Sequence, residues 1–188
     1  VVSVADSFSA EELSRRLVLA RADAVVTVGR FERAGKPIDL YAKVREAGAP
    51  RAVVIGAAPE RKQDLAWNDF LGGSESFEAL PSDPDALTNL LFSSGTTGEP
   101  KVIPWTHLTP VKCASDGFFH QDLRPGDVAA WPTNIGWMMG PWLIYAALVN
   151  GAAIALYEGA PGSAGFARFV QDSGVTMLGV VPSLVKAW

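Results

Sequence analysis

The fold of this chain is decided by the stretch Phe92-Ser93-Ser94-Gly95-Thr96-Thr97-Gly98-Glu99-Pro100-Lys101. Apolar segments typical of strands lie on either side of it, at residues 86–92 and 102–106. We therefore expect two buried strands joined by a polar loop. The glycines of the loop lack a Cβ atom, so the backbone can adopt positive φ and approach a ligand closely. Successive N–H groups in such a turn can form a concavity that binds anions.

The loop offers a polyphosphate several hydrogen-bond donors and one positive charge. Each of its four hydroxyl side chains both donates and accepts, and its lysine adds a compact cation on a flexible stem. The spacing differs from the Walker A pattern, which needs four residues between its glycines. A solvated loop without a ligand is the alternative. We assign the catalytic role to Lys101, and we assign phosphate contact to Ser93, Ser94, Gly95, Thr96, Thr97, Gly98 and Lys101.

The loop resembles the signature motif of the adenylate-forming superfamily, which includes acyl-CoA synthetases, luciferases and the adenylation domains of peptide synthetases. The family pattern is roughly [Ser/Thr]-Ser-Gly-[Ser/Thr]-Thr-Gly-x-Pro-Lys, and residues 93–101 match every fixed position. Many members have glycine after the lysine, where this chain has Val102. A second segment, residues 131–140, is similar to the acetyl-CoA synthetase branch, with Asn134 in place of the usual Asp. Within that branch the chain most resembles plant acyl-activating enzymes.

The resemblance implies a ligase that works in two steps. A carboxylic acid would react with ATP to give an acyl-adenylate and pyrophosphate, and coenzyme A would then displace AMP. Mg²⁺ would neutralise the phosphates, with Thr96 or Thr97 as its neighbours. The alternative is a non-catalytic nucleotide-binding or interaction module of the same fold. Neither the acid nor the oligomeric state follows from the sequence.

The resemblance also implies an acyl-binding segment after the phosphate loop. Methionine is flexible and suits an apolar ligand. Ordinary packing of an apolar helix in the core is the alternative, and the sequence leaves both open. The residues that we expect to contact the acyl group are Trp137, Met138, Met139 and Gly140.

Helix and strand patterns alternate along the chain, which is typical of an α/β protein with mostly parallel sheets flanked by helices. Ser9 and Glu12 form a capping-box pattern that opens a helix running to about Arg21. The other elements that we expect are strands at 24–28, 52–55, 128–131, 152–157 and 175–181, and helices at 40–47, 67–71, 108–119, 137–149, 166–172 and from 182.

We divide the chain into a first α/β part at residues 1–56, an irregular connection at 57–84 and a second α/β part at 85–188, which contains the phosphate loop at 92–101. By its resemblance, the whole would be part of the N-terminal domain of an adenylate-forming enzyme. The chain begins at Val1 without an initiator Met and stops at Trp188 inside an expected helix. We therefore expect an internal fragment that does not complete a turnover alone.

Composition excludes several other classes of protein. Of the 188 residues, 48% are hydrophobic and 19% are charged, which allows a substantial core. The net charge of −4 and the scattered basic residues argue against a nucleic-acid partner. The single cysteine, Cys113, excludes an internal disulfide and a cysteine-cluster metal site, and two histidines do not make a zinc site. We assign no metal ligand among the side chains.

Residues 135–157 form an uncharged run of 23 residues, which is long enough to suggest a membrane span. The turn pattern Asn150-Gly151 inside the run argues against a span, so we expect a buried helix followed by a buried strand. No signal peptide is visible, and the sequence leaves the compartment unknown. The resemblance implies an intracellular location. The resemblance to plant enzymes adds the peroxisome as a candidate compartment.

Overall fold

The computed structural model describes residues 1–33, 36–93 and 100–187. The described strands are β1 (Val25–Val28), β2 (Arg30–Arg33), β3 (Lys36–Asp39), β4 (Ala52–Ile55), β5 (Leu65–Ala66), β6 (Leu87–Ser93), β7 (Lys101–Thr106), β8 (Val128–Ala130), β9 (Ala153–Ile154) and β10 (Met177–Leu178). The described helices are α1 (Ala10–Ala20), α2 (Leu40–Glu46), α3 (Trp67–Phe70), α4 (Leu108–His120), α5 (Met139–Leu148), α6 (Ala164–Asp172) and α7 (Pro182–Ala187).

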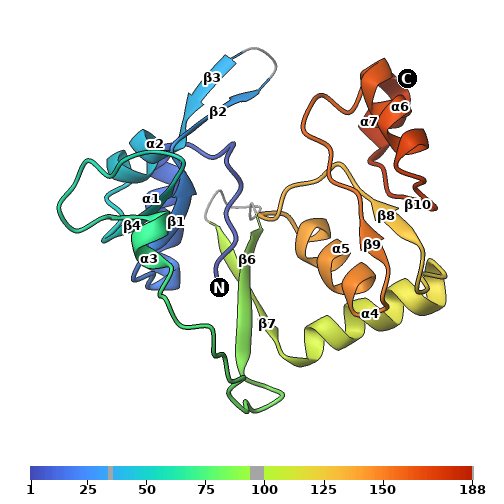
Figure 1. The fold of residues 1–188 in the computed structure, drawn as a ribbon, viewed down its shortest axis with the longest axis horizontal. Coiled ribbons are helices and arrows are strands. Elements are labelled where there is room, and N and C mark those ends of the chain that lie inside the picture. Colours follow the sequence, from blue (N-terminus) through green and yellow to red (C-terminus); the bar gives the residue numbers. More distant parts are fainter. Residues whose placement is uncertain (34–35, 94–99, 188) are drawn as a thin grey trace.

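The strands form two parallel sheets, with the orders β1-β4-β5 and β10-β8-β9, and two antiparallel pairs, β2-β3 and β6-β7. Figure 1 shows α1 to α3 beside the first sheet, α4 to α7 beside the second, and the β6-β7 hairpin between these two units. We call them the first unit and the second unit. The predicted α/β class, with parallel sheets flanked by helices, is confirmed.

The first unit is built on β1 and β4, which pair in parallel from Val25 opposite Ala52 onward. Helix α1 begins as predicted, because the Ser9 hydroxyl accepts a hydrogen bond from the Glu12 N–H (3.2 Å) and the Glu12 carboxylate accepts one from the Ser9 N–H (3.0 Å). The helices α1 and α2 cover the sheet and close one apolar core. Its buried members are Leu13, Tyr41, Val44, Ala47, Ala49, Ala52 and Val54.

The first unit contains a buried polar cluster centred on the carboxylate of Asp64. That carboxylate accepts hydrogen bonds from the Tyr41 hydroxyl (2.7 Å), the Ala52 N–H (2.8 Å) and two nitrogens of the Arg61 guanidinium (2.8 and 2.9 Å). Burial pushes the pKa of Asp64 upward, but the hydrogen bonds from Arg61, Tyr41 and Ala52 outweigh it, so the pKa lies below its ordinary value. The cluster joins α2, β4 and the segment before β5.

Two features of the first unit were not expected from the sequence. Strands β2 and β3 form a hairpin directly after β1, in a segment for which we expected neither a helix nor a strand. Strand β5 adds Leu65 and Ala66 to the first sheet by pairing with β4, so this sheet extends past residue 56 into the segment that we expected to be irregular. Both pieces are short and carry little apolar periodicity, which is why the pattern of residues did not reveal them.

The second unit packs α5 against a sheet of three short parallel strands. The predicted helix after residue 136 forms as α5, and its buried face meets β8 and β9. The core of this unit contains Leu123, Ala129, Leu143, Ala146, Ala147 and Ala152. The small alanine side chains let α5 lie close to the sheet and to α4.

Strands β9 and β10 are shorter than the segments 152–157 and 175–181 that we expected. Their common partner β8 ends at Ala130, and Pro132, which follows soon after, has no N–H to continue the ladder. The last ladder bonds run from the Ala155 N–H to Ala129 and from the Gly179 N–H to Ala130. Beyond them the chain leaves the sheet, and Leu156 is 83% exposed instead of buried.

The strands beside the phosphate loop pair as an antiparallel hairpin, but only one of them is buried. In β6, Leu91 and Phe92 are buried, whereas β7 exposes every residue from Lys101 to Pro104 and buries Trp105. The expectation of two buried strands is therefore wrong for β7. It is an edge strand, and an edge position tolerates Pro104, which has no N–H to donate.

The uncharged run at residues 135–157 folds into the ten-residue helix α5, a turn and β9. In the part of the chain that the structure describes, no helix is both long and apolar enough to cross a membrane.

Candidate active site

The end of the β6-β7 hairpin brings together the first and the last of the predicted phosphate-binding residues. Ser93 and Lys101 are paired across the two strands at the point where the ladder ends. Ser93 is half-buried and Lys101 is exposed. The other predicted phosphate contacts lie outside the described residues. They are Ser94, Gly95, Thr96, Thr97 and Gly98.

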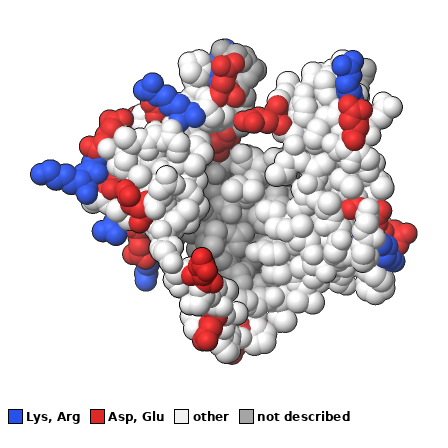
Figure 2. Space-filling model, in the orientation of Figure 1, with Lys and Arg blue, Asp and Glu red and all other residues white. Residues whose placement is uncertain are grey.

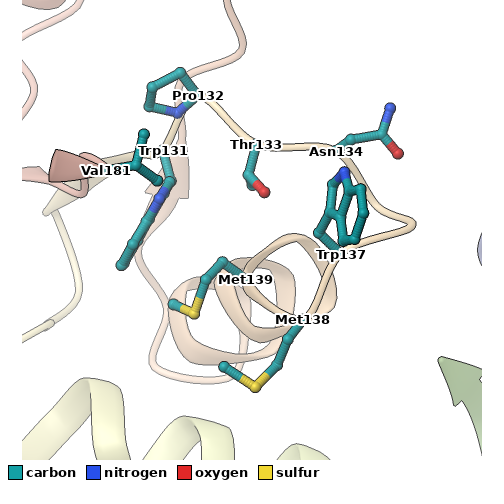
Figure 3. A pocket seen from close by; sticks show the side chains of 8 residues that line it. All are labelled: Trp131, Pro132, Thr133, Asn134, Trp137, Met138, Met139 and Val181. Atoms are coloured by element: carbon teal, nitrogen blue, oxygen red, sulfur yellow. The ribbon is translucent and has the colours of Figure 1, made fainter. Parts of the chain in front are cut away.

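A hollow of about 420 Å³ opens at the carboxyl end of the second sheet. Figure 3 shows Trp131 and Trp137 on opposite sides of it, with Met138 and Met139 below and the Thr133 hydroxyl pointing between them. None of the described residues that line it is charged. The described residues of the lining are Trp131, Pro132, Thr133, Asn134, Trp137, Met138, Met139 and Val181.

Three of the four residues predicted to contact an acyl group line this hollow. Trp137 is 43% exposed and Met138 is 60% exposed, so neither is an ordinary core side chain, while Met139 is half-buried. The fourth, Gly140, is buried and does not line the hollow. A Cβ atom on Gly140 would come within 2.5 Å of the Asn134 carbonyl oxygen, so glycine is what lets α5 begin directly against the preceding loop.

Sequence reasoning did not assign Trp131, Pro132, Thr133 or Val181 to a site. The first three follow β8 directly, and Val181 follows the neighbouring strand β10. In open α/β sheets ligands bind outside the carboxyl ends of the strands. Applied to the two expected strands, that rule would have pointed to these residues.

Two side chains, Phe8 and Arg16, link the hollow to the hairpin. The Phe8 ring lies 5.6 Å from the Trp137 ring, centroid to centroid. The guanidinium carbon of Arg16 lies 3.7 Å from the centroid of Phe8 and 5.6 Å from that of Phe92, which directly precedes Ser93. The contacts run in series from Trp137 through Phe8 and Arg16 to Phe92, so they connect a wall of the hollow to the end of β6.

Arg16 is a buried cation, only 4% exposed. Burial lowers its pKa below the ordinary arginine value, and its guanidinium donates a hydrogen bond to the Glu12 carbonyl (2.7 Å). Since it lies against two aromatic faces, its interaction with them is of the cation–π type. Arg16 therefore acts as a fixed support beneath Phe8 rather than as a solvent-exposed binding group.

Charge is distributed unevenly around this region. On the face shown in Figure 2, Lys, Arg, Asp and Glu side chains lie mainly over the first unit and at the margins. Cys113 in α4 is buried, and burial is the main reason that its pKa is raised to about 11. A thiol with so high a pKa is protonated at neutral pH, so it does not serve as a nucleophile.

A family model for AMP-binding enzymes matches residues 1–188. The chain belongs to this family. The predicted membership of the adenylate-forming superfamily is thereby confirmed, as is the similarity to plant acyl-activating enzymes and acetyl-CoA synthetases.

Among similar proteins of this AMP-binding family, a hexanoyl-CoA synthase from Cannabis sativa is 55% identical over 100% of this chain and 28% of its own length. Probable acyl-activating enzyme 17, peroxisomal, from Arabidopsis thaliana is 50% identical over 100% of this chain and 28% of its own length. The chain thus spans less than a third of the length of these relatives.

Solved structures of this family have the same fold. Acetoacetyl-CoA synthetase from Streptomyces lividans superposes with a TM-score of 0.80 at 29% identity, over 96% of this chain and 29% of that protein. An acyl-CoA synthetase from Brucella canis superposes with a TM-score of 0.83 at 19% identity, over 99% of this chain and 33% of its own, and supports the fold alone.

Proposed function

We propose that this chain forms the phosphate-binding and acyl-binding part of an ATP-dependent, AMP-forming acyl-CoA ligase. In the first step an oxygen of the acid would bond to the α-phosphorus of ATP while the bond to pyrophosphate breaks. In the second step the sulfur of coenzyme A would attack the acyl carbon, and AMP would leave. The chain alone would not complete this cycle, because its relatives are more than three times as long.

One observation carries the proposal: the side chains of Phe8 and Arg16 link the last described part of the hairpin to a hollow whose described lining is uncharged. The reaction requires a carboxylate to meet a phosphate, so a phosphate-binding hairpin must lie near an acyl-binding cavity. Holding the two reactants at neighbouring sites lowers the entropic part of the barrier.

Lys101 has an electrostatic role in this proposal. It is exposed opposite Ser93, where its ammonium group can reach phosphate oxygens beyond the end of the hairpin. As pyrophosphate departs, negative charge gathers on its oxygens, and a positioned cation stabilises that charge in the transition state. The predicted contacts at residues 94–98 would add hydrogen bonds to the same phosphates.

Magnesium would accompany the nucleotide and neutralise part of its phosphate charge. Among the described residues, no group of three or more His, Cys, Asp or Glu side chains could hold a metal ion. We therefore propose that phosphate oxygens and water provide most of its ligands, as Mg²⁺ commonly prefers, with the hydroxyl of Thr96 or Thr97 beside it.

The hollow favours an aliphatic acid. Its described lining offers two tryptophans, two methionines and a valine, but no cation to pair with a second carboxylate. Methionine side chains adapt to flexible chains of differing length. We propose a monocarboxylic acid of short to medium chain length, in keeping with the name of the hexanoyl-CoA synthase relative.

ATP–pyrophosphate exchange by the full-length protein tests this function. The assay would use acids of two to twelve carbons together with aromatic and dicarboxylic acids. We expect exchange with aliphatic monocarboxylic acids. Nucleotide binding without exchange for any acid would favour the alternative, a non-catalytic module of the same fold.

Replacing Lys101 by Ala should lower the rate of exchange about a hundredfold, the loss typical for one oxyanion-stabilising donor. Lys62→Ala is the matched control, because Lys62 is an exposed lysine of the first unit. Equal exchange rates in the two variants would contradict the role given to Lys101.

Two Arabidopsis relatives are named peroxisomal. We propose the same compartment for the parent of this chain. Imaging of the full-length protein, tagged so that its native C-terminus stays free, tests this location.

A further inference from the structure

The first eight residues connect the hairpin to the hollow, and we call residues 1–8 the N-terminal strap. Its beginning pairs with β6 on the side opposite β7, since Val2 bridges Leu90 in parallel and the Leu90 N–H donates to the Val1 carbonyl (2.9 Å). Figure 1 shows the strap as a dark blue trace beside β6, between the two units. It then continues toward the loop that precedes α5.

The strap lies directly on the backbone of that loop at Gly136. A Cβ atom on Gly136 would come within 2.1 Å of the Ala5 nitrogen and 2.6 Å of the Val4 carbonyl carbon. No side chain fits in that space, so the approach of the strap depends on glycine at this position. Gly136 immediately precedes Trp137, a wall of the hollow.

Asn134 fixes the same loop through both ends of its side-chain amide. Its oxygen accepts a hydrogen bond from the Gly136 N–H (2.8 Å), and its nitrogen donates one to the Asp6 carboxylate (3.2 Å). Figure 3 shows this amide turned away from the centre of the hollow. An amide can both accept and donate in this way, whereas an ionised carboxylate only accepts.

Two further contacts hold the strap in place beside Trp137. The Lys43 ammonium donates to the main-chain carbonyl of Asp6 (2.6 Å), which ties the strap to α2. The Phe8 ring packs against Trp137 on one side and against the Arg16 guanidinium on another. Trp137 is thus supported from the strap while it lines the hollow.

We propose that Asp6 and Phe8 are positioning residues that fix Trp137 at the wall of the hollow and thereby set which acyl chains it accepts. Neither residue lines the hollow, so each acts through Asn134 or Trp137. The selectivity part rests on the proposed function. The placement of Trp137 rests on the structure alone, and the test separates the two.

Swapping the residue types of the hydrogen-bonded pair Asp6 and Asn134 tests the proposal in the full-length protein. In Asn134→Asp the new carboxylate at position 134 and the carboxylate of Asp6 face each other. Two negative charges so close together repel, so the contact is lost. The double variant Asp6→Asn with Asn134→Asp restores one donor and one acceptor, and Asp at position 134 can still accept from the Gly136 N–H. A merely structural contact would lower stability in Asn134→Asp and restore it in the double variant without changing the selectivity between acids in either.

We expect the KM for the preferred acid in pyrophosphate exchange to rise about tenfold in Asn134→Asp, with kcat at saturating acid retained within about threefold. The ratio of kcat/KM between short and longer acids should shrink by a similar factor. In the double variant both quantities should return toward those of the parent. An unchanged acid profile in Asn134→Asp, or no recovery in the double variant, would overturn the proposal.

A second measurement does not depend on turnover. In protein labelled with 5-fluorotryptophan, the fluorine resonance that Trp137→Phe removes belongs to Trp137. We expect this resonance to shift in Asn134→Asp, to return in the double variant, and to respond to added hexanoate less strongly in the single variant. A Trp137 resonance unaffected by Asn134→Asp would overturn the placement, whereas absence of exchange with every acid would overturn the proposed function instead.

Discussion

Met139 shows how a single residue can control the proposed acyl site. It is half-buried at the start of α5 and lines the hollow, where its flexible thioether takes up part of the space. In an apolar pocket, two substrates that differ by one methylene group are discriminated by about tenfold or more. The size of the side chain at position 139 should therefore affect the chain length that is accepted.

Replacing Met139 by Ala should shift the preferred acid toward longer chains, since the removed atoms leave room for additional carbons. We expect kcat/KM for acids longer than the parent optimum to rise about tenfold relative to that for shorter acids. Leu148→Ala is the control, because Leu148 is exposed at the opposite end of the same helix. The measurement is pyrophosphate exchange over an acid series with the full-length protein. Identical length profiles for the two variants would remove Met139 from the acyl site.

At this scale the sequence proposed site residues by motif and did not propose residues that meet only in space. Ser93, Lys101, Trp137 and Met139 belong to patterns that can be read along the chain. Val181 reaches the hollow only because β10 lies next to β8 in the sheet. That neighbour relation arises from the order of the strands, which local periodicity does not reveal.

Among the elements, β4 depends on the polar cluster around Asp64. The Ala52 N–H at the start of β4 donates to the Asp64 carboxylate, and this carboxylate also pairs with Arg61. Removing one partner of a buried pair leaves the other charge without compensation, which costs about 3 kcal/mol or more.

Asp64→Asn should therefore weaken β4 strongly at neutral pH. The folded-state pKa of Asp64 is lower than its unfolded value, so its contribution is complete above the ordinary carboxyl pKa and is lost as the pH falls through the lowered one. The difference in the stability of β4 between the parent and Asp64→Asn should consequently become smaller in acid. Hydrogen exchange of peptides that contain β4 measures the effect, with Asp69→Asn, an exposed position in α3, as the control. A difference in β4 protection between the parent and Asp64→Asn that grows in acid would contradict this account.

Elements with a strong apolar pattern or a clear cap were predicted well, as α1 and β4 show. The β2-β3 hairpin was missed because its strands carry charged and polar residues at most positions and bury little apolar surface. Strand β7 was expected to be buried because its sequence is apolar. Its exposure follows from its edge position, which only the complete arrangement of strands determines.

The molecule as a whole consists of two α/β units with a hairpin between them, and the N-terminal strap contacts all three. It pairs with β6, it is tied to α2 of the first unit through Lys43, and it lies on the loop of the second unit at Gly136. Its sequence has no strong secondary-structure pattern, so its connecting role could not be predicted. The role depends on the close approach to one glycine.

Gly136→Ala should therefore loosen the arrangement of the units without unfolding either of them. The new Cβ would collide with backbone atoms of the strap, which cannot rotate away as a side chain can, and such overpacking costs about 1 to 3 kcal/mol. We expect faster hydrogen exchange in peptides covering residues 1–8 and β6, while peptides from β4 and α5 keep their protection. Gly72→Ala is the matched control, because nothing lies within 4 Å of a Cβ atom at that position. If both alanine variants leave exchange of the strap unchanged, the strap does not join the units. If β4 and α5 also lose protection, the strap stabilises each unit separately and not the contact between them.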